Sequence, residues 1–190
     1  MTENERETVL KMAVAYNTDF AMQDENKVKR IKEKFINDFT VDVTKEPEYV
    51  LQLLETAYLE QKASDVECSL IIGGMFSLIS VEYTDIMLKL LKEDWHFCHE
   101  DIASYFQRFK IPEAVDLLYE TSLRQFEYLE YDDFFALAVK CIWALGDINT
   151  KESIDKLKLL AQSNNEIIKK NALNQLERIR NGEKNKNRHA

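Results

Sequence analysis

Two histidines and two acidic residues lie within six positions of one another and form the densest polar cluster in the chain. On a helix, His96, His99 and Glu100 would lie on neighbouring faces within about one turn, a spacing compatible with a metal ion. The order HxxH lacks the general base that HExxH supplies, and the only other histidine is His189. We therefore predict no metal and no cofactor, with a metal-binding enzyme that uses His96, His99 and Glu100 as an alternative. Glu100 and Asp101 would instead lie in the first turn of a helix, where acidic side chains interact favourably with the helix dipole.

A second cluster mixes acidic and aromatic side chains between two predicted helices. It is suited to an interface, because tyrosine combines a large contact area with a polar group. The alternative is a solvated turn with one tyrosine packed inward. The residues that we predict to contact a partner come from both clusters and are Asp94, His96, His99, Glu100, Asp101, Glu127, Tyr128, Glu130, Tyr131, Asp132 and Asp133.

Signatures of common enzymes are absent from the sequence. It has no P-loop, no GxGxxG, no GxSxG and no HExxH, so we predict that the chain is not an enzyme. The pair Gly73-Gly74 lacks the basic residue of a phosphate loop, and close helix packing or a kink is its expected role. Cys68, Cys98 and Cys141 are odd in number and far apart, and each occupies an apolar helical position. They predict buried thiols in a reducing compartment.

The sequence also predicts a cytoplasmic location. Residues 1–7 are polar and acidic, unlike a secretory signal. The longest apolar run, residues 70–79, is too short to cross a bilayer as a helix. We therefore expect no membrane partner.

The charge is concentrated in the middle of the chain. The 190 residues contain 25 Lys and Arg against 34 Asp and Glu, a net charge of −9. Residues 42–133 hold 20 acidic and seven basic residues, whereas residues 134–190 hold six acidic and 11 basic ones. An acidic middle repels nucleic acid phosphates and attracts a basic partner. The alternative is that acidity serves only to keep the chain soluble.

The residues that must position these clusters are patterned as helices almost throughout. Four glycines and two prolines argue against a loop-rich β fold, and apolar residues recur with helical period. Seven predicted helices have both bounds: residues 5–16, 27–39, 65–79, 84–92, 95–109, 151–162 and 165–180. Three further helices are predicted, one that begins at Pro47, one that begins at Pro112 and one that ends at Leu145.

Specific residues are expected to begin or end these helices. Asp94 is the predicted N-cap of the helix over 95–109, and Asp65 that of the helix over 65–79. Asp132 or Asp133 is expected to begin the helix that ends at Leu145, with Gly146 just beyond its end. On these helices, we expect Trp95 and Trp143 to be buried. The alternatives are an exposed anchor at Trp95 and an interaction surface at Trp143.

A repeat near the end of the sequence predicts how the helices stack. Leu137, Cys141, Ile142 and Leu145 have counterparts 31 residues later, at Ile168, Ala172, Leu173 and Leu176. The connecting stretch, with Ala144-Leu145-Gly146-Asp147 followed by Ile154 and Leu157, resembles a HEAT-like repeat. We predict an all-α fold, a right-handed α-solenoid of about three to four HEAT-like helical hairpins. It would be a single domain with an N-terminal helical cap (1–64), a repeat region (65–180) and a polar, flexible tail (181–190).

Several strings are also similar to a bacterial group of small HEAT-repeat proteins. They are Glu93-Asp94-Trp95-His96, His99-Glu100-Asp101-Ile102, Tyr128-Leu129-Glu130-Tyr131-Asp132 and Lys140-Cys141-Ile142-Trp143-Ala144-Leu145. Members of this group are often encoded beside polymorphic toxins. The resemblance implies an immunity protein that neutralises a cognate toxin by occluding its active site. Charge then suggests a basic toxin domain of the nuclease type. The alternative is a non-catalytic scaffold or assembly protein.

Overall fold

The computed structural model describes residues 1–21 and 24–188, with side chains described except at 17–21 and 183–188. In these residues the protein is all-helical and contains no β-strand. This confirms the predicted all-α class. The chain forms two compact units, the first of Met1–Ile86 with Trp95–Phe97, the second of Met87–Asp94 with Cys98–Ala190.

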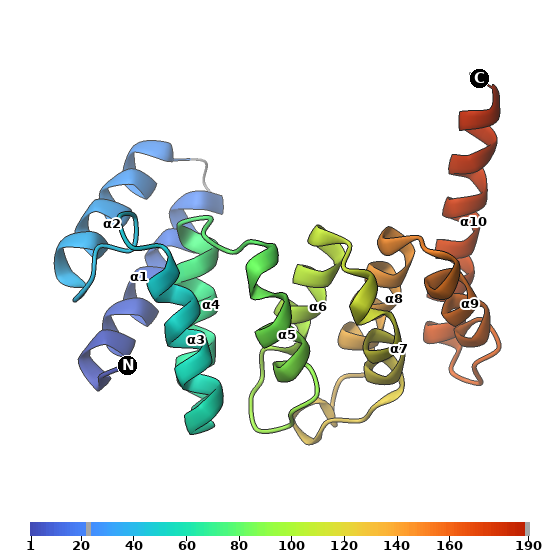
Figure 1. Ribbon diagram of the computed structural model, residues 1–190, viewed down its shortest axis with the longest axis horizontal. Coiled ribbons are helices and arrows are strands. Elements are labelled where there is room, and N and C mark those ends of the chain that lie inside the picture. The colour runs from blue at the N-terminus through green and yellow to red at the C-terminus, as the bar shows by residue number, and fades with distance from the viewer. Residues whose placement is uncertain (22–23, 189–190) are drawn as a thin grey trace. The chain divides into compact units, whose positions relative to one another are not determined.

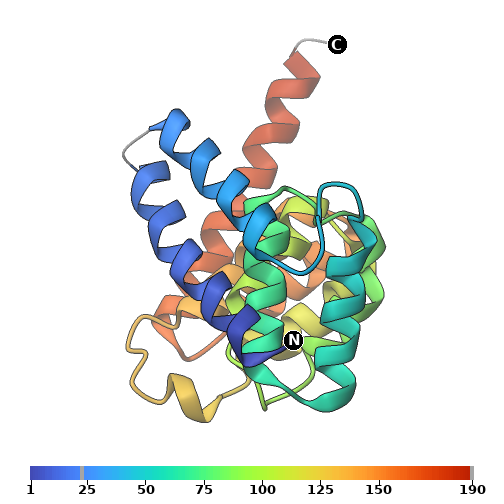
Figure 2. The same cartoon turned by 90° about the vertical axis from the view of Figure 1, so that its left-hand side faces the viewer.

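The first unit is built on four long helices (Figure 1). In this unit α1 packs against α2 and α4, and α3 packs against α4. Figure 2 shows α1 and α2 as an antiparallel pair. The core at their contact gathers residues such as Val9, Phe35, Val50 and Ile72, all fully buried. The helices are α1 (Glu3–Ala21), α2 (Glu25–Asp38), α3 (Glu48–Glu60) and α4 (Ala63–Met75). A short α5 (Thr84–Leu90) follows and crosses the boundary between the two units.

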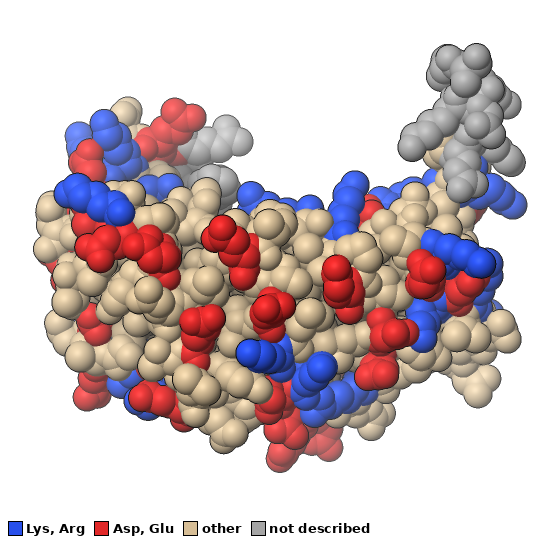
Figure 3. All heavy atoms as spheres, in the orientation of Figure 1, with Lys and Arg blue, Asp and Glu red and all other residues tan. Residues whose placement is uncertain are grey.

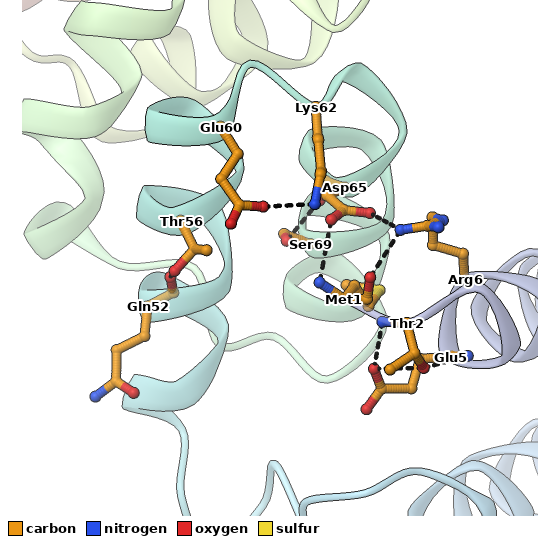
Figure 4. Close-up of polar contacts among 10 residues, drawn as sticks. All are labelled: Met1, Thr2, Glu5, Arg6, Gln52, Thr56, Glu60, Lys62, Asp65 and Ser69. Atoms are coloured by element: carbon orange, nitrogen blue, oxygen red, sulfur yellow. Dashed lines mark hydrogen bonds and ion pairs between the residues drawn. The ribbon is translucent and has the colours of Figure 1, made fainter.

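A buried carboxylate ties the start of α1 to α4. Asp65 is 2% exposed, and its two carboxylate oxygens lie 2.9 Å from Nη1 of Arg6 and 3.1 Å from the amino group of Met1 (Figure 4). The N-cap of α4 is Lys62, with Asp65 inside the first turn. The predicted capping role of Asp65 is therefore wrong, because its side chain pairs with Arg6 on α1 and with the chain's amino group just before α1.

The helices of the second unit pack around α8. α8 contacts α6 and α10, while α7 and α9 contact α8 and each other. Their bounds are α6 (His99–Phe109), α7 (Val115–Leu123), α8 (Ala136–Ile148), α9 (Lys151–Leu160) and α10 (Glu166–Arg188). Short 3-10 turns at Pro112–Ala114 and Glu127–Leu129 lie before and after α7. The first half of the 31-residue pattern is buried, but Leu173 is 49% exposed.

The end of α8 departs from the sequence prediction at Gly146. Gly146 lies inside α8, where a Cβ would come within 3.0 Å of the side chains of Gln175 and Arg178. Its absence of a side chain therefore permits close packing of α8 and α10. α8 instead ends at Asn149, whose φ of 54° is left-handed. Left-handed residues other than glycine also end α3, at Gln61, and α6, at Lys110.

Other predicted features have mixed outcomes. Thr150 is the N-cap of α9 and forms a reciprocal capping box with Ser153. The three cysteines are buried and free, which confirms the prediction of buried thiols. Trp143 is 40% exposed, so its predicted burial is wrong, and the guanidinium of Arg178 lies 5.5 Å from its ring centroid. Helix α10 continues to Arg188, and the rest of the predicted tail, residues 189–190, lies outside the described residues.

Candidate partner-binding site

The structure separates the two histidines of the first predicted cluster. α6 begins at His99, so His96 precedes the helix, and the helix predicted to start after Asp94 is four residues too long. The ring of His96 packs edge-on against Trp95, which in turn contacts Tyr58. This packing accounts for apolar residues before α6 that resembled a helical stripe. Trp95 is half-buried in this loop, so the core position predicted for it on a helix is only partly attained.

Both histidines have 0% exposure. Because neither presents surface to a partner, their predicted place in the partner-binding set is wrong. Among the side chains that the structure describes, no three His, Cys, Asp or Glu residues come close enough to hold a metal ion.

His99 instead connects three segments of the second unit. Its Nε2 lies 2.8 Å from the carbonyl oxygen of Glu93, and its Nδ1 lies 2.8 Å from the hydroxyl of Tyr128. Since a carbonyl only accepts, Nε2–H donates to Glu93 and Nδ1 accepts from Tyr128. Burial raises the pKa of Tyr128 to about 12, with a smaller contribution from Glu100, so the hydroxyl keeps its proton at neutral pH. The ring of Phe126 lies 4.1 Å from that of His99.

This arrangement anchors residues 124–135, which we name the acidic-aromatic loop. The loop leaves the end of α7 and leads to α8, and Figure 2 shows it projecting beyond the helices of its unit. The second predicted cluster lies wholly within it. Tyr128 is the tyrosine packed inward, whereas Tyr131 is 91% exposed. The loop therefore combines a buried attachment point with an open tip.

Asp132 shapes the second half of the loop. Its carboxylate accepts hydrogen bonds from the backbone N–H groups of Phe134, at 3.0 Å, and Ala136, at 2.6 Å. The sequence predicts that Asp132 or Asp133 caps this helix, and that prediction is wrong, because the N-cap is Phe135. Asp132 lies three residues before the N-cap and accepts from the N–H of the first helical residue, Ala136. The N-cap itself is Phe135, with a φ of 52°. A left-handed conformation is strained for a bulky residue, and Phe135 lines the cavity described next.

A cavity of about 720 Å³ lies against the acidic-aromatic loop. Residues between Thr121 and Ala138 supply one wall, and the other comes from Ser163 and Asn165, in the turn between α9 and α10, with Ile168 in the first turn of α10. Phe126 and Ile168 are buried, while Glu127 and Glu130 are exposed. The cavity thus has an apolar floor and an acidic rim. Figure 3 shows acidic side chains gathered at the lower edge of the drawn face, with Lys and Arg side chains beside them.

Three carboxylates of the loop are uncompensated. Within the described residues, Glu127, Glu130 and Asp133 have no ion pair, and all three are exposed. Among the described residues, Arg124 is the one cation that lines the cavity. Its guanidinium contacts the Lys92 carbonyl at 2.6 Å and the Asp94 carboxylate at 3.6 Å, and lies over the ring of Phe126. The rim therefore keeps a net negative charge.

The remaining predicted residues lie close in sequence to α6. Asp94 is exposed and pairs with Arg124, which connects it to the cavity wall. Glu100 lies 3.5 Å from Nζ of Lys140 on α8, and Asp101 is exposed in the first turn of α6. Acids in this turn agree with the predicted dipole role. Neither Glu100 nor Asp101 lines the cavity.

Sequence reasoning missed part of this site. Phe134 is 79% exposed and Phe135 is 36% exposed, and both directly follow the acidic run that was singled out. Their adjacency to that run was an available signal. No sequence signal pointed to Arg124. None pointed to the second wall either, because that wall lies about 30 residues further along the chain, at Ser163, Asn165 and Ile168.

In the part of the chain that the structure describes, no helix is both long enough and apolar enough to traverse a lipid bilayer. No protein-family model matches the chain, and neither curated proteins nor solved structures provided a match.

Proposed function

We propose that this chain is an immunity protein, a protein-binding inhibitor that neutralises a cognate bacterial toxin by covering its active site. The observation that carries the proposal is the acidic-aromatic loop, where unpaired carboxylates and exposed aromatic rings border a cavity. Uncompensated charge and exposed aromatic surface are characteristic of a binding surface. The similarity of four sequence strings to small HEAT-repeat immunity proteins supplies the specific function.

The proposal includes an architecture. We infer that the helices belong to a right-handed α-solenoid of HEAT-like hairpins. Two features of the second unit support this inference: α8 contacts both α6 and α10 while α7 contacts α9, and a 31-residue apolar pattern relates α8 to α10. Repeats that stack in this way present extended surfaces, which suits a protein that covers another protein's cleft.

Charge indicates the class of toxin. A cleft that binds nucleic acid is lined by Lys and Arg, and the loop offers Glu127, Glu130 and Asp133 to such a surface. Opposite charges would accelerate the encounter of inhibitor and toxin at low salt. We therefore propose a nuclease-type toxin with a basic active-site cleft as the partner.

Co-expression tests the proposal. The chain would be produced in a host that is killed by the product of the gene immediately upstream, and survival and a purified one-to-one complex would be scored. We expect rescue by the native chain and loss of rescue with Glu127→Lys plus Glu130→Lys. The control pair, Glu113→Lys plus Glu120→Lys, changes two exposed acids of the same unit by the same charge, outside the cavity.

The outcomes separate function from mechanism. Rescue that survives the Glu127 and Glu130 changes would keep the immunity function but remove the loop as its surface. A complex without rescue would indicate the scaffold alternative. Neither rescue nor a complex would remove the proposed function.

A further inference from the structure

We infer that the cavity beside the acidic-aromatic loop takes an arginine side chain, with an apolar neighbour, from a basic segment of the partner. The inference rests on the proposed function in one respect only, that the partner is a protein. It names the group that the cavity recognises, which the proposed function leaves open.

The lining of the cavity matches both ends of such a side chain. Phe126, Leu137 and Ile168 line it, and because each is at most 5% exposed they form a packed apolar floor of small accessible area. Glu127 and Glu130 line it and are exposed, with no ion pair among the described residues. Arginine buries an aliphatic stem against apolar surface while its guanidinium pairs with carboxylates.

An anionic occupant fits the same residues poorly. Arg124 is already engaged by Asp94, Lys92 and the Phe126 ring. The start of α10 also borders the cavity, but Oδ1 of Asn165 accepts from the N–H groups of Ile167 and Ile168. These are the donors that would otherwise bind an anion. A phosphate or carboxylate would therefore meet occupied donors and a rim of carboxylates.

The size and the aromatic rings favour arginine within a peptide over an isolated small cation. A volume of about 720 Å³ lies within the range of ~300–1,000 Å³ typical of sites that enclose an organic ligand. Phe135 lines the cavity and remains 36% exposed. An aromatic face of this kind stacks on a planar guanidinium, and arginine uses such faces more often than lysine.

The test titrates the isotope-labelled full chain with three capped pentapeptides of the form acetyl-Gly-Leu-X-Leu-Gly-amide. X is arginine, citrulline or glutamate, and citrulline keeps the shape of arginine without its charge. Amide NMR shifts report both affinity and location. We expect shifts at Phe126, Leu137 and Ile168, with affinity for the arginine peptide about fivefold above that for citrulline, the effect of two partly exposed charge pairs. The glutamate peptide should bind most weakly.

Neutral variants connect the preference to the two acids. Glu127→Gln plus Glu130→Gln should lower affinity for the arginine peptide to that for citrulline, while Glu113→Gln plus Glu120→Gln should leave the preference intact. Equal binding of arginine and citrulline, shifts that map elsewhere, or an equal loss with the control pair would each overturn the inference.

Failure of this inference and failure of the proposed function give different results. The peptide titration needs no toxin, so selectivity for arginine without rescue would remove the immunity function and retain the cationic site. Rescue by a chain that binds the three peptides equally would retain the immunity function and remove the proposed arginine site.

Discussion

The hydroxyl of Tyr128 donates a hydrogen bond to Nδ1 of His99 over 2.8 Å, and so joins the acidic-aromatic loop to the first residue of α6. The opposite nitrogen of the same ring holds the carbonyl of Glu93. A fully buried imidazole thus satisfies both of its polar atoms with groups from two other segments. The position of the proposed binding loop depends on this buried contact.

A double-mutant cycle measures the contact. Tyr128→Phe should lower the free energy of unfolding by about 1 kcal/mol in the native background, because it removes one intramolecular hydrogen bond. In the background of His99→Ala the same change should cost close to nothing, since the acceptor is already absent. Urea unfolding followed by circular dichroism gives all four values. Tyr131→Phe is the control, because that side chain is 91% exposed, and an equal cost of Tyr128→Phe in both backgrounds would contradict the assignment.

Tyr83 makes the opposite prediction from Tyr128. Its hydroxyl is buried and finds no hydrogen-bond partner among the described residues. Tyr83→Phe removes a polar group that is desolvated without compensation, so stability should stay unchanged or rise. The midpoint of urea unfolding, compared with that of Tyr128→Phe, provides the measurement. A clear loss of stability would indicate that the hydroxyl is hydrogen-bonded in solution.

Both tyrosines predict weakening at alkaline pH. Burial raises the pKa of Tyr83 and of Tyr128 to about 12, from an ordinary value of 10. Between these two pH values the unfolded chain loses phenolic protons that the folded chain retains, so the free energy of unfolding falls as pH rises from about 10 to about 12. The free energy of unfolding, measured at several pH values across this interval, should fall less steeply with pH for Tyr128→Phe than for the native chain. An unchanged pH dependence in both Phe variants would show that other groups dominate.

The buried carboxylate of α4 predicts a stability loss far from the loop. Asp65→Asn keeps the shape of the side chain but leaves the Met1 amino group and Arg6 without their anion. We expect a loss of about 2 kcal/mol, below that of a fully buried pair, because the Arg6 side chain reaches water. Glu67→Gln, an exposed neighbour on the same helix, should have little effect. Thermal unfolding compares the two, and equal effects would mean that charge near α4 matters without a specific pair.

Adjacent glycines in α4 predict effects of opposite sign. A Cβ at Gly73 would lie 2.7 Å from Cγ1 of Ile79, whereas one at Gly74 meets nothing within 4 Å. Gly73→Ala should therefore destabilise, because Ile79 has to move. Gly74→Ala should stabilise by up to about 1 kcal/mol, the helix preference of alanine over glycine. Chemical denaturation of the two variants tests this pair, and a shared sign would show that Ile79 adapts without cost.

Periodicity found most of the helices because their packed faces are local in sequence. Residues 27–39 are an example: Ile31 and Phe35 fall on one stripe, and α2 forms there. The same reasoning places the start of α6 too early. Trp95 extends the apolar pattern toward the N-terminus, but its ring contacts Tyr58, which is distant in sequence, and does not lie on the helix. Gly146 was read as a helix end, but its lack of a side chain accommodates Gln175, nearly 30 residues away.

The candidate site was predicted only where its residues are consecutive. Glu127, Glu130 and Tyr131 could be singled out because acids and aromatics follow one another in one segment. Burial of His99 could not be read from the sequence, since its partners are a distant tyrosine and a backbone carbonyl. Nor could the cavity, which exists only where the loop meets the start of α10.

Three residues at the C-terminal ends of α-helices have left-handed backbone conformations, and substitution there could raise the thermal stability of the protein. They are Gln61, Lys110 and Asn149. A left-handed residue with a side chain costs roughly 1–2 kcal/mol, a cost that glycine avoids. None of the three lines the cavity, so glycine at these turns offers an engineer thermal tolerance without altering the surface we propose for recognition. The chain has only four glycines, and none of them occupies these three positions, so the gain in stability is still available.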